Sequence, residues 1–159
     1  MKKFNLALAA ITVFAFLFVG SFTNSGKVLA QDRGVVTVKS IRSFDETVDQ
    51  AKQLVAKNGM MVLAEVNQGK ILSMTGLDTK GISLFVGNPQ VGNKLFSADR
   101  GAGLAVPVRL NIYEGKDGKT YINYVKPSVQ LASFNNGMIN NIADKLDKKL
   151  GMLTGMLSK

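Results

Sequence analysis

The stretch from Gly87 to Lys94, Gly-Asn-Pro-Gln-Val-Gly-Asn-Lys, contains residue types that could bind a small anion. An apolar run ends here, and a helix is predicted to begin at Pro89 after an Asn88 cap, so its first N–H groups would offer an anion site. The side chains that would hold the anion are those of Asn88, Gln90, Asn93 and Lys94. The stretch lacks the Gly-Lys-Ser/Thr ending of a phosphate loop, and Pro89 removes an N–H that such a loop would use. A capped strand-to-helix junction without a ligand is the simpler interpretation.

A second set of candidate ligand-binding residues lies in the last predicted helix. Met138 and Met152, together with Met156, are flexible and polarisable side chains. If this helix packs on a sheet, they could adapt to a small hydrophobic or amphiphilic molecule held between the two.

The chain contains neither His nor Cys. The common nucleophile-and-base arrangements and the soft metal sites are therefore excluded. The acidic groups Asp45, Glu46 and Asp49, and likewise Asp144 and Asp147, fall on the outer faces of predicted helices. We therefore expect no enzyme, no catalytic residues, no metal site and no cofactor.

The net charge is +9, but the lysines are scattered singly along the chain rather than clustered with aromatic residues. A nucleic-acid-binding surface usually gathers Lys and Arg on one element. We therefore expect no nucleic-acid partner and interpret the charge as a solvated basic surface.

The first 30 residues resemble a signal peptide. Lys2 and Lys3 precede an apolar core over residues 6–20, and a small-residue cleavage site ends at Ala30. The alternative, an uncleaved membrane anchor, is disfavoured because this core is shorter than the roughly 20 residues of a spanning helix. We expect cleavage after Ala30, export to the periplasm or medium, and no stable membrane anchor afterwards. Without Cys, the exported domain depends on its core alone for stability.

The rest of the chain alternates between strand and helix patterns. Ser43 and Glu46 form a capping box that predicts a helix ending near Asn58-Gly59, and Asp117-Gly118 predicts a hairpin turn. Strands are predicted over residues 35–41, 60–66, 82–86, 104–114 and 119–125, and a short helix over residues 89–98. Residues 70–76 are predicted to form a short helix or turn.

The final segment has an amphipathic stripe that predicts a long helix. Its apolar positions are Met138, Ile139, Ile142, Leu146, Leu150, Leu153 and Leu157. We expect this stripe to pack on the core rather than on a partner or a membrane, because the chain has few other helices to cover its sheet. The predicted organisation is an α+β domain over residues 31–134, with the C-terminal amphipathic helix of residues 135–159 packed on the same domain. The predicted fold is a mostly antiparallel sheet of about five strands with helices packed on one face.

Four motifs in this order resemble the bacterial domain-of-unknown-function 302 family. They begin at Ser43 (Ser-Phe-Asp-Glu-Thr-Val), Leu84 (Leu-Phe-Val-Gly-Asn-Pro-Gln-Val-Gly), Tyr113 (Tyr-Glu-Gly-Lys-Asp-Gly-Lys) and Tyr124 (Tyr-Val-Lys-Pro). The resemblance implies a TATA-binding-protein-like topology and no established activity. The chain departs from the family where Gln68 stands in place of a frequent His, and where Lys126 stands in place of a frequent Asp. Gln68 cannot replace a His in metal binding or proton transfer.

These observations leave three hypotheses for function. The first is an exported, non-enzymatic domain that binds a small hydrophobic or amphiphilic molecule, or an anion. The second is a structural or interaction protein of the cell envelope that acts as a homodimer. The third, which the composition favours least, is an enzyme that uses Lys or oxygen ligands.

Overall fold

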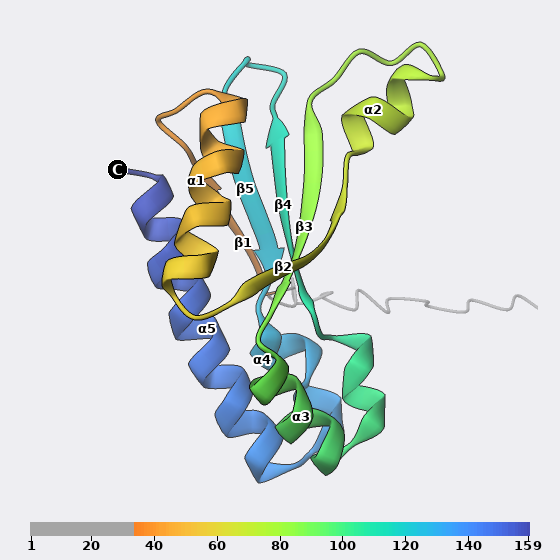
Figure 1. Ribbon diagram of the computed structural model, residues 1–159, viewed down its shortest axis with the longest axis vertical. Coiled ribbons are helices and arrows are strands. Elements are labelled where there is room, and N and C mark those ends of the chain that lie inside the picture. The colour runs from red at the N-terminus through yellow and green to blue at the C-terminus, as the bar shows by residue number, and fades with distance from the viewer. Residues whose placement is uncertain (1–33) are drawn as a thin grey trace, which may run out of the picture.

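Five antiparallel strands form one sheet in the computed structural model, which describes residues 34–159. The expected signal peptide lies outside the described residues. The strand order across the sheet is β1-β5-β4-β3-β2 (Figure 1), and the α+β fold class is confirmed. The strands are β1 (Val35–Lys39), β2 (Met61–Val66), β3 (Gly81–Gly87), β4 (Val108–Glu114) and β5 (Thr120–Val125).

The β4–β5 hairpin forms as the Asp117-Gly118 turn predicts. Ile112 lies opposite Ile122, and the rings of Tyr113 and Tyr121 stack with their centroids 5.6 Å apart. The strand predicted from residue 104 begins only at residue 108, because Arg100–Leu104 forms a short 3₁₀ helix, η1. Pro107, which follows η1, has no N–H to donate to a strand ladder.

Two helices, α1 (Phe44–Lys57) and α5 (Gly137–Leu157), cover one face of the sheet (Figure 1). The capping box is present, because Ser43 Oγ accepts a hydrogen bond from Glu46 N while the Glu46 carboxylate accepts one from Ser43 N. The buried face of α1 includes Val48, Ala51 and Val55, as its periodicity predicts. These side chains pack with the inward-facing residues of the three central strands in the larger core cluster.

Helix α5 contributes to two hydrophobic clusters. Its C-terminal half places Leu150, Leu153 and Leu157 in the cluster between α1, α5 and the sheet. Its N-terminal half places Ile139 and Ala143 in a smaller cluster with residues of α3 (Pro89–Ala98), η1 and the segment before α5. The helix therefore closes both the sheet and the helical end of the molecule.

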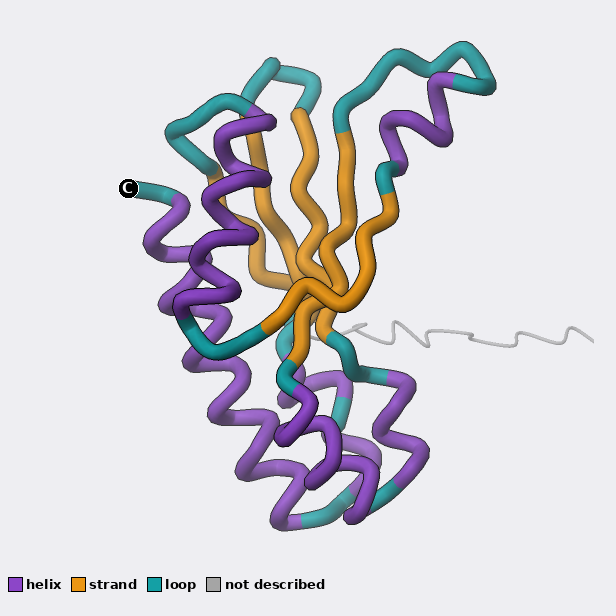
Figure 2. The backbone as a smooth tube through the Cα atoms, viewed as in Figure 1, coloured by secondary structure: helices purple, strands orange, loops and turns teal. Residues whose placement is uncertain are grey.

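The remaining elements lie around this body. Helix α2 (Gln68–Ser73) and the loop after it project beside β2 and β3, away from the other helices (Figure 2). Helix α4 (Pro127–Gln130) and the 3₁₀ turn η2 (Ala132–Phe134) lead from β5 to α5. Between residues 34 and 159, no helix is both long and apolar enough to cross a membrane.

Candidate ligand-binding site

The junction between β3 and α3 is capped by Asn88, as the sequence predicts. Asn88 Oδ1 accepts hydrogen bonds from Gln90 N at 2.8 Å and Val91 N at 3.2 Å. Its Nδ2 donates to Gly59 O at 2.7 Å and so ties α3 to the end of α1. Because the first N–H groups of α3 already have a partner in Asn88, an anion at this helix start would compete with the cap.

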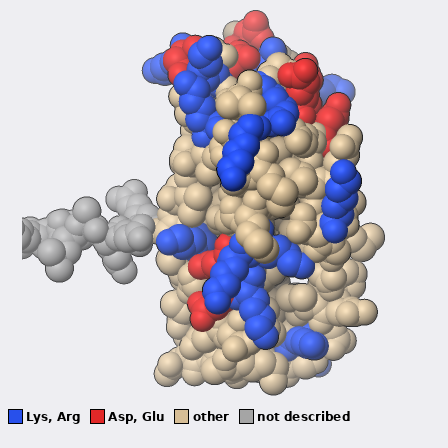
Figure 3. Space-filling view, turned by 90° about the vertical axis from the view of Figure 1, so that its left-hand side faces the viewer, with Lys and Arg blue, Asp and Glu red and all other residues tan. Residues whose placement is uncertain are grey.

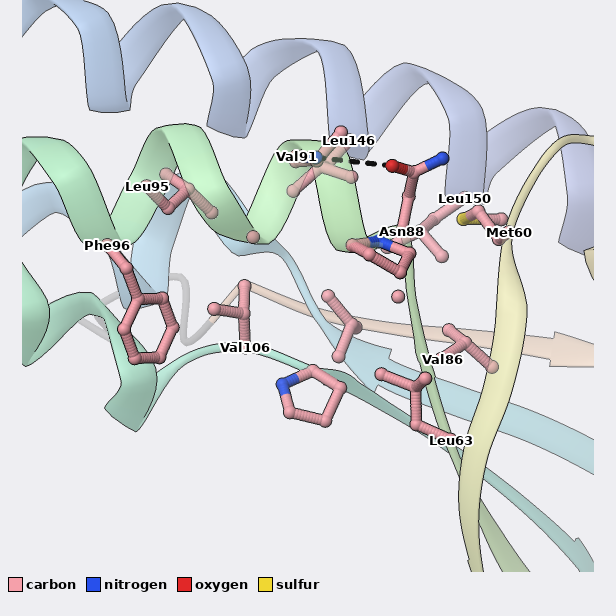
Figure 4. A pocket seen from close by; sticks show the side chains of 15 residues that line it. Met60, Leu63, Val86, Asn88, Val91, Leu95, Phe96, Val106, Leu146 and Leu150 are labelled. Atoms are coloured by element: carbon pink, nitrogen blue, oxygen red, sulfur yellow. Dashed lines mark hydrogen bonds between the residues drawn. The ribbon is translucent and has the colours of Figure 1, made fainter.

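Beside this junction lies an apolar cavity of about 180 Å³, partly open to solvent and bounded by α3, α5 and the adjoining end of the sheet (Figure 4). In Figure 4, Phe96 and Leu95 stand at one end of the cavity and Met60 and Leu63 at the other. The lining residues are Met60, Leu63, Val86, Gly87, Asn88, Pro89, Val91, Gly92, Leu95, Phe96, Val106, Pro107, Val108, Leu146 and Leu150. Apart from the Asn88 amide, all of the lining side chains are apolar.

The size of this cavity limits what it can hold. An engineered apolar cavity of roughly 150 Å³ in another protein binds benzene, so about 180 Å³ accommodates about six or seven non-hydrogen atoms. Pockets for drug-sized ligands are larger, at about 300–1,000 Å³. The cavity therefore suits a small apolar molecule or one short chain.

A groove of about 300 Å³ adjoins the cavity between α3 and α5. Four residues line both hollows, so the groove and the cavity meet at Met60, Asn88, Val91 and Leu146. We call this hollow the basic groove, because its remaining lining residues are Lys94, Ile142, Lys145 and Lys149. Figure 3 shows the side of the molecule formed by α1 and α5, where Lys and Arg side chains lie in both the upper and the lower half, with Asp and Glu side chains beside some of them.

The lysines of the basic groove have no carboxylate partner among the described residues. The ion pairs within residues 34–159 join Lys52 to Glu65 and Lys80 to Glu114. Lys149 Nζ donates a hydrogen bond to the carbonyl oxygen of Asn58 at 2.8 Å, which holds this side chain beside the end of α1. The groove therefore carries positive charge that no acidic side chain of this region neutralises directly.

The structure places the predicted site residues in different surroundings. Asn88 lines both the cavity and the basic groove, and Lys94 lines the groove, whereas Gln90 and Asn93 are exposed and line neither. Met138, Met152 and Met156 are 57%, 58% and 42% exposed and line neither hollow. The expectation that these methionines face the interior is wrong, because Leu150, Leu153 and Leu157 form the buried face of α5.

The sequence patterns did not identify several of the lining residues as parts of a binding site. Leu63, Phe96 and Val106 come from separate segments, and each is an ordinary apolar residue in its own pattern. Gly92 also lines the cavity, and a Cβ at this position would meet no atom within 4 Å. A glycine inside a helix costs about 1 kcal/mol relative to Ala, but it does not by itself indicate a cavity, because Gly151 and Gly155 of α5 also have open space and line neither hollow.

A polar row crosses the sheet face that α1 and α5 leave uncovered. Gln68 Nε2 donates to Ser83 Oγ, and Asn111 Nδ2 donates to Asn123 Oδ1 at 3.1 Å. The Oε1 atom of Gln68 is buried without a hydrogen-bond partner. A hollow of about 510 Å³ beside this row is lined by Phe85, Arg109 and other residues. Within residues 34–159, no group of three or more acidic side chains gathers where a metal ion could bind.

At the hairpin tip, two titratable groups that do not line the cavity interact with each other. Tyr121 Oη donates to Asp117 Oδ2 at 2.8 Å. This hydrogen bond holds the pKa of the Asp117 carboxyl below its usual value and raises the pKa of Tyr121. The pair stabilises the turn and is not part of the candidate site.

Comparisons with known proteins agree with the resemblance seen in the sequence. The family described as "Domain of unknown function DUF302" matches residues 36–156. The crystal structure of an uncharacterized conserved protein DUF302 from Bacillus stearothermophilus is similar, with a TM-score of 0.72 and 25% sequence identity. The similarity covers 78% of this chain and 98% of that one.

Two longer relatives carry a functional name. Proteins named fluoride-specific ion channel FluC 1, from Brucella suis biovar 1 and Brucella abortus biovar 1, are each 30% identical over 125 residues. The match covers 78% of this chain but 47% and 44% of those proteins, so the chain spans a little less than half their length.

Proposed function

Because the chain belongs to the family described as Domain of unknown function DUF302, whose description names no activity, we propose a function from its own structure. The domain is a non-enzymatic binding protein for a small hydrophobic or amphiphilic molecule, held in the apolar cavity between α3, α5 and the sheet. The observation that carries this proposal is the cavity of about 180 Å³ itself, whose lining is apolar except for one amide.

Burial of apolar surface supplies the binding energy in this proposal. A site of this size gains about 25 cal/mol for each Å² of apolar ligand surface removed from water. Asn88, the one polar side chain of the lining, already makes three hydrogen bonds within the protein. A guest in the cavity is therefore selected by size and shape rather than by directed hydrogen bonds.

The composition and the N-terminal sequence support the other parts of the proposal. A chain without His or Cys lacks the side chains of the common catalytic arrangements, which favours binding over catalysis. The signal-peptide pattern of residues 1–30 favours export to the periplasm or the medium. The channel activity in the name of the Brucella relatives belongs to proteins more than twice as long as the matched region, and it forms no part of this proposal.

The proposal is tested by substitutions that add a side chain to a residue of the cavity wall. Gly92 lines the cavity and a Cβ at this position would meet no atom within 4 Å, so Gly92→Leu adds a side chain at the cavity wall. Gly151→Leu makes the same change at an exposed position of α5, where a Cβ also meets no atom. Benzene, the probe, should shift the backbone amide NMR signals of α3 and of the adjoining strand ends in the wild type and in G151L, but not in G92L. If G92L folds poorly, Gly92→Ala, with its single added methyl group, should still weaken binding. Equal binding by all variants, or no binding by the wild type, would overturn the proposal.

A second candidate function, an envelope interaction protein that acts as a homodimer, is favoured by a different surface. The outer strand β2 and the projecting α2 segment expose large apolar side chains, namely Met61, Leu63, Val66, Ile71, Leu72, Met74 and Leu77. An exposed edge strand is a ready place for pairing with a second sheet. Native mass spectrometry over a range of protein concentrations tests this candidate, and a concentration-independent monomer would contradict it.

A further inference from the structure

We propose that the ligand is an anionic amphiphile with one short apolar tail, a medium-chain carboxylate or alkyl phosphate. The tail occupies the apolar cavity and the acidic head group lies in the basic groove. This inference rests on the proposed function, and it adds the chemical class of the ligand and the residues that recognise its charge.

The charges on α5 are divided between two sides of the helix. Lys145 and Lys149, four residues apart, line the basic groove on the α3 side. The acidic residues of the same helix face α4 instead: Asp147 accepts hydrogen bonds from Ser128 N and Ser128 Oγ, and Asp144 lines a separate hollow with Ser128. An anion in the groove therefore meets the lysines without an intervening carboxylate.

The third lysine comes from the opposite wall of the groove. Helix α3 has Lys94 as its charged residue, so the groove has cations on both walls. Lys94 and Lys145 are exposed and can turn toward a head group, whereas Lys149 is held by the Asn58 carbonyl. Three ammonium groups around one hollow favour a carboxylate or phosphate over a neutral or cationic head group.

The arrangement of the two hollows fixes the orientation of the ligand. Met60, Val91 and Leu146 line both of them, so an apolar chain that begins in the groove meets hydrophobic side chains as it enters the cavity. The cavity accepts about six or seven non-hydrogen atoms, which is less than the acyl chains of a membrane lipid and close to the chain of octanoate. The Asn88 amide is occupied by its own hydrogen bonds, so recognition of the head group falls to the lysines.

The test compares ligands that share a tail and differ in charge. Octanoate, octyl phosphate, 1-octanol and octyltrimethylammonium are titrated into the protein and followed by calorimetry and by backbone amide NMR signals. Octanoate and octyl phosphate should bind more tightly than 1-octanol, and octyltrimethylammonium more weakly. Raising the salt concentration from about 0.05 to about 0.5 M should weaken the two anions and leave 1-octanol unchanged, because exposed charges are screened. Whichever of octanoate and octyl phosphate binds more tightly shows which head group, carboxylate or phosphate, the groove prefers.

Substitutions on the two walls test the role of the lysines. Lys94→Gln and Lys145→Gln should each weaken octanoate binding by about two- to fivefold, the range expected for partly exposed charges. Lys148→Gln removes the same charge from an α5 position outside the groove and should leave binding unchanged. None of the three should alter 1-octanol binding.

The outcomes separate this inference from the function on which it rests. Equal affinity for octanoate and 1-octanol, together with loss of both in G92L, would overturn the anionic head group and leave the cavity as the binding site. An equal effect of K148Q and K145Q would overturn the groove as the place of recognition. If G92L binds every probe as the wild type does, the proposed function fails together with this inference.

Discussion

Replacing Leu153 by Ala tests whether α5 is part of the core. Leu153 lies on the inner face of the helix, is fully buried, and belongs to the cluster formed by α1, α5 and the sheet. Its neighbour Met152 is 58% exposed on the other side of the same helix. Truncating each of these two neighbouring side chains to Ala therefore compares the loss of a buried side chain with the loss of an exposed one.

The expected loss follows from the atoms that the substitution removes. Leu→Ala deletes three carbon groups, and about 0.8 kcal/mol for each gives a transfer loss of about 2.4 kcal/mol. A cavity that the surroundings do not refill adds to this loss, and measured Leu→Ala costs reach about 5 kcal/mol. We therefore expect Leu153→Ala to lower the free energy of unfolding by about 2.5–5 kcal/mol, and Met152→Ala by no more than about 0.5 kcal/mol.

Urea denaturation followed by far-UV circular dichroism measures both changes. With a denaturant dependence of about 1.5 kcal/mol per molar urea, a loss of about 3 kcal/mol lowers the midpoint by about 2 M. The slope should stay the same in both variants if the transition remains cooperative. A Leu153→Ala variant whose free energy of unfolding lies within about 0.5 kcal/mol of Met152→Ala would refute the placement of α5 in the core.

Two further predictions follow from the same structure. Truncation after Phe134 removes four side chains from the core, those of Ile139, Leu150, Leu153 and Leu157. Their burial contributes about 1.5–3 kcal/mol each, and the sum is similar to the whole stability of a domain, so the truncated chain should not fold. A cooperative thermal melt of the truncated chain would contradict this prediction. Tyr121→Phe removes the main cause of the lowered pKa of Asp117, so an NMR titration should show this pKa rising toward its usual value, with Tyr113→Phe as the control. A carboxyl whose pKa is lower in the folded than in the unfolded state stabilises the fold at pH values above the unfolded-state pKa, and this stabilisation is lost as the pH falls through the folded-state pKa. When the pH is lowered below about 4, Y121F should therefore lose less stability than the wild type.

The sequence alone predicted the features that depend on neighbours in the chain. The Ser43–Glu46 capping box, the Asn88 cap before Pro89 and the Asp117-Gly118 hairpin each need only a few consecutive residues, and all three are present. The buried stripe of α5 also followed from its period, although Met138 at its start is exposed. Caps and turns depend on local hydrogen bonds, and the buried stripe depends on the helical repeat, so these features can be predicted without knowing the fold.

The candidate site could be predicted only in part. Asn88 and Lys94 belong to the two hollows, and the local chemistry of the junction singled them out. The methionines were misplaced because a flexible apolar side chain is equally compatible with a core position and with the surface. A hydrophobic pattern shows which face of a helix is buried, but it does not show where the packing against that face is incomplete.

The sequence by itself determined the class of the fold, the helix caps, the hairpin and the absence of His and Cys chemistry. Only the tertiary structure decided that residues 60–63, 86–96, 106–108 and 146–150 surround one cavity, and that lysines from two helices meet beside it. The physical reason is that a cavity is a shortfall of packing between segments distant in the chain, and it therefore depends on how all of them are arranged at once.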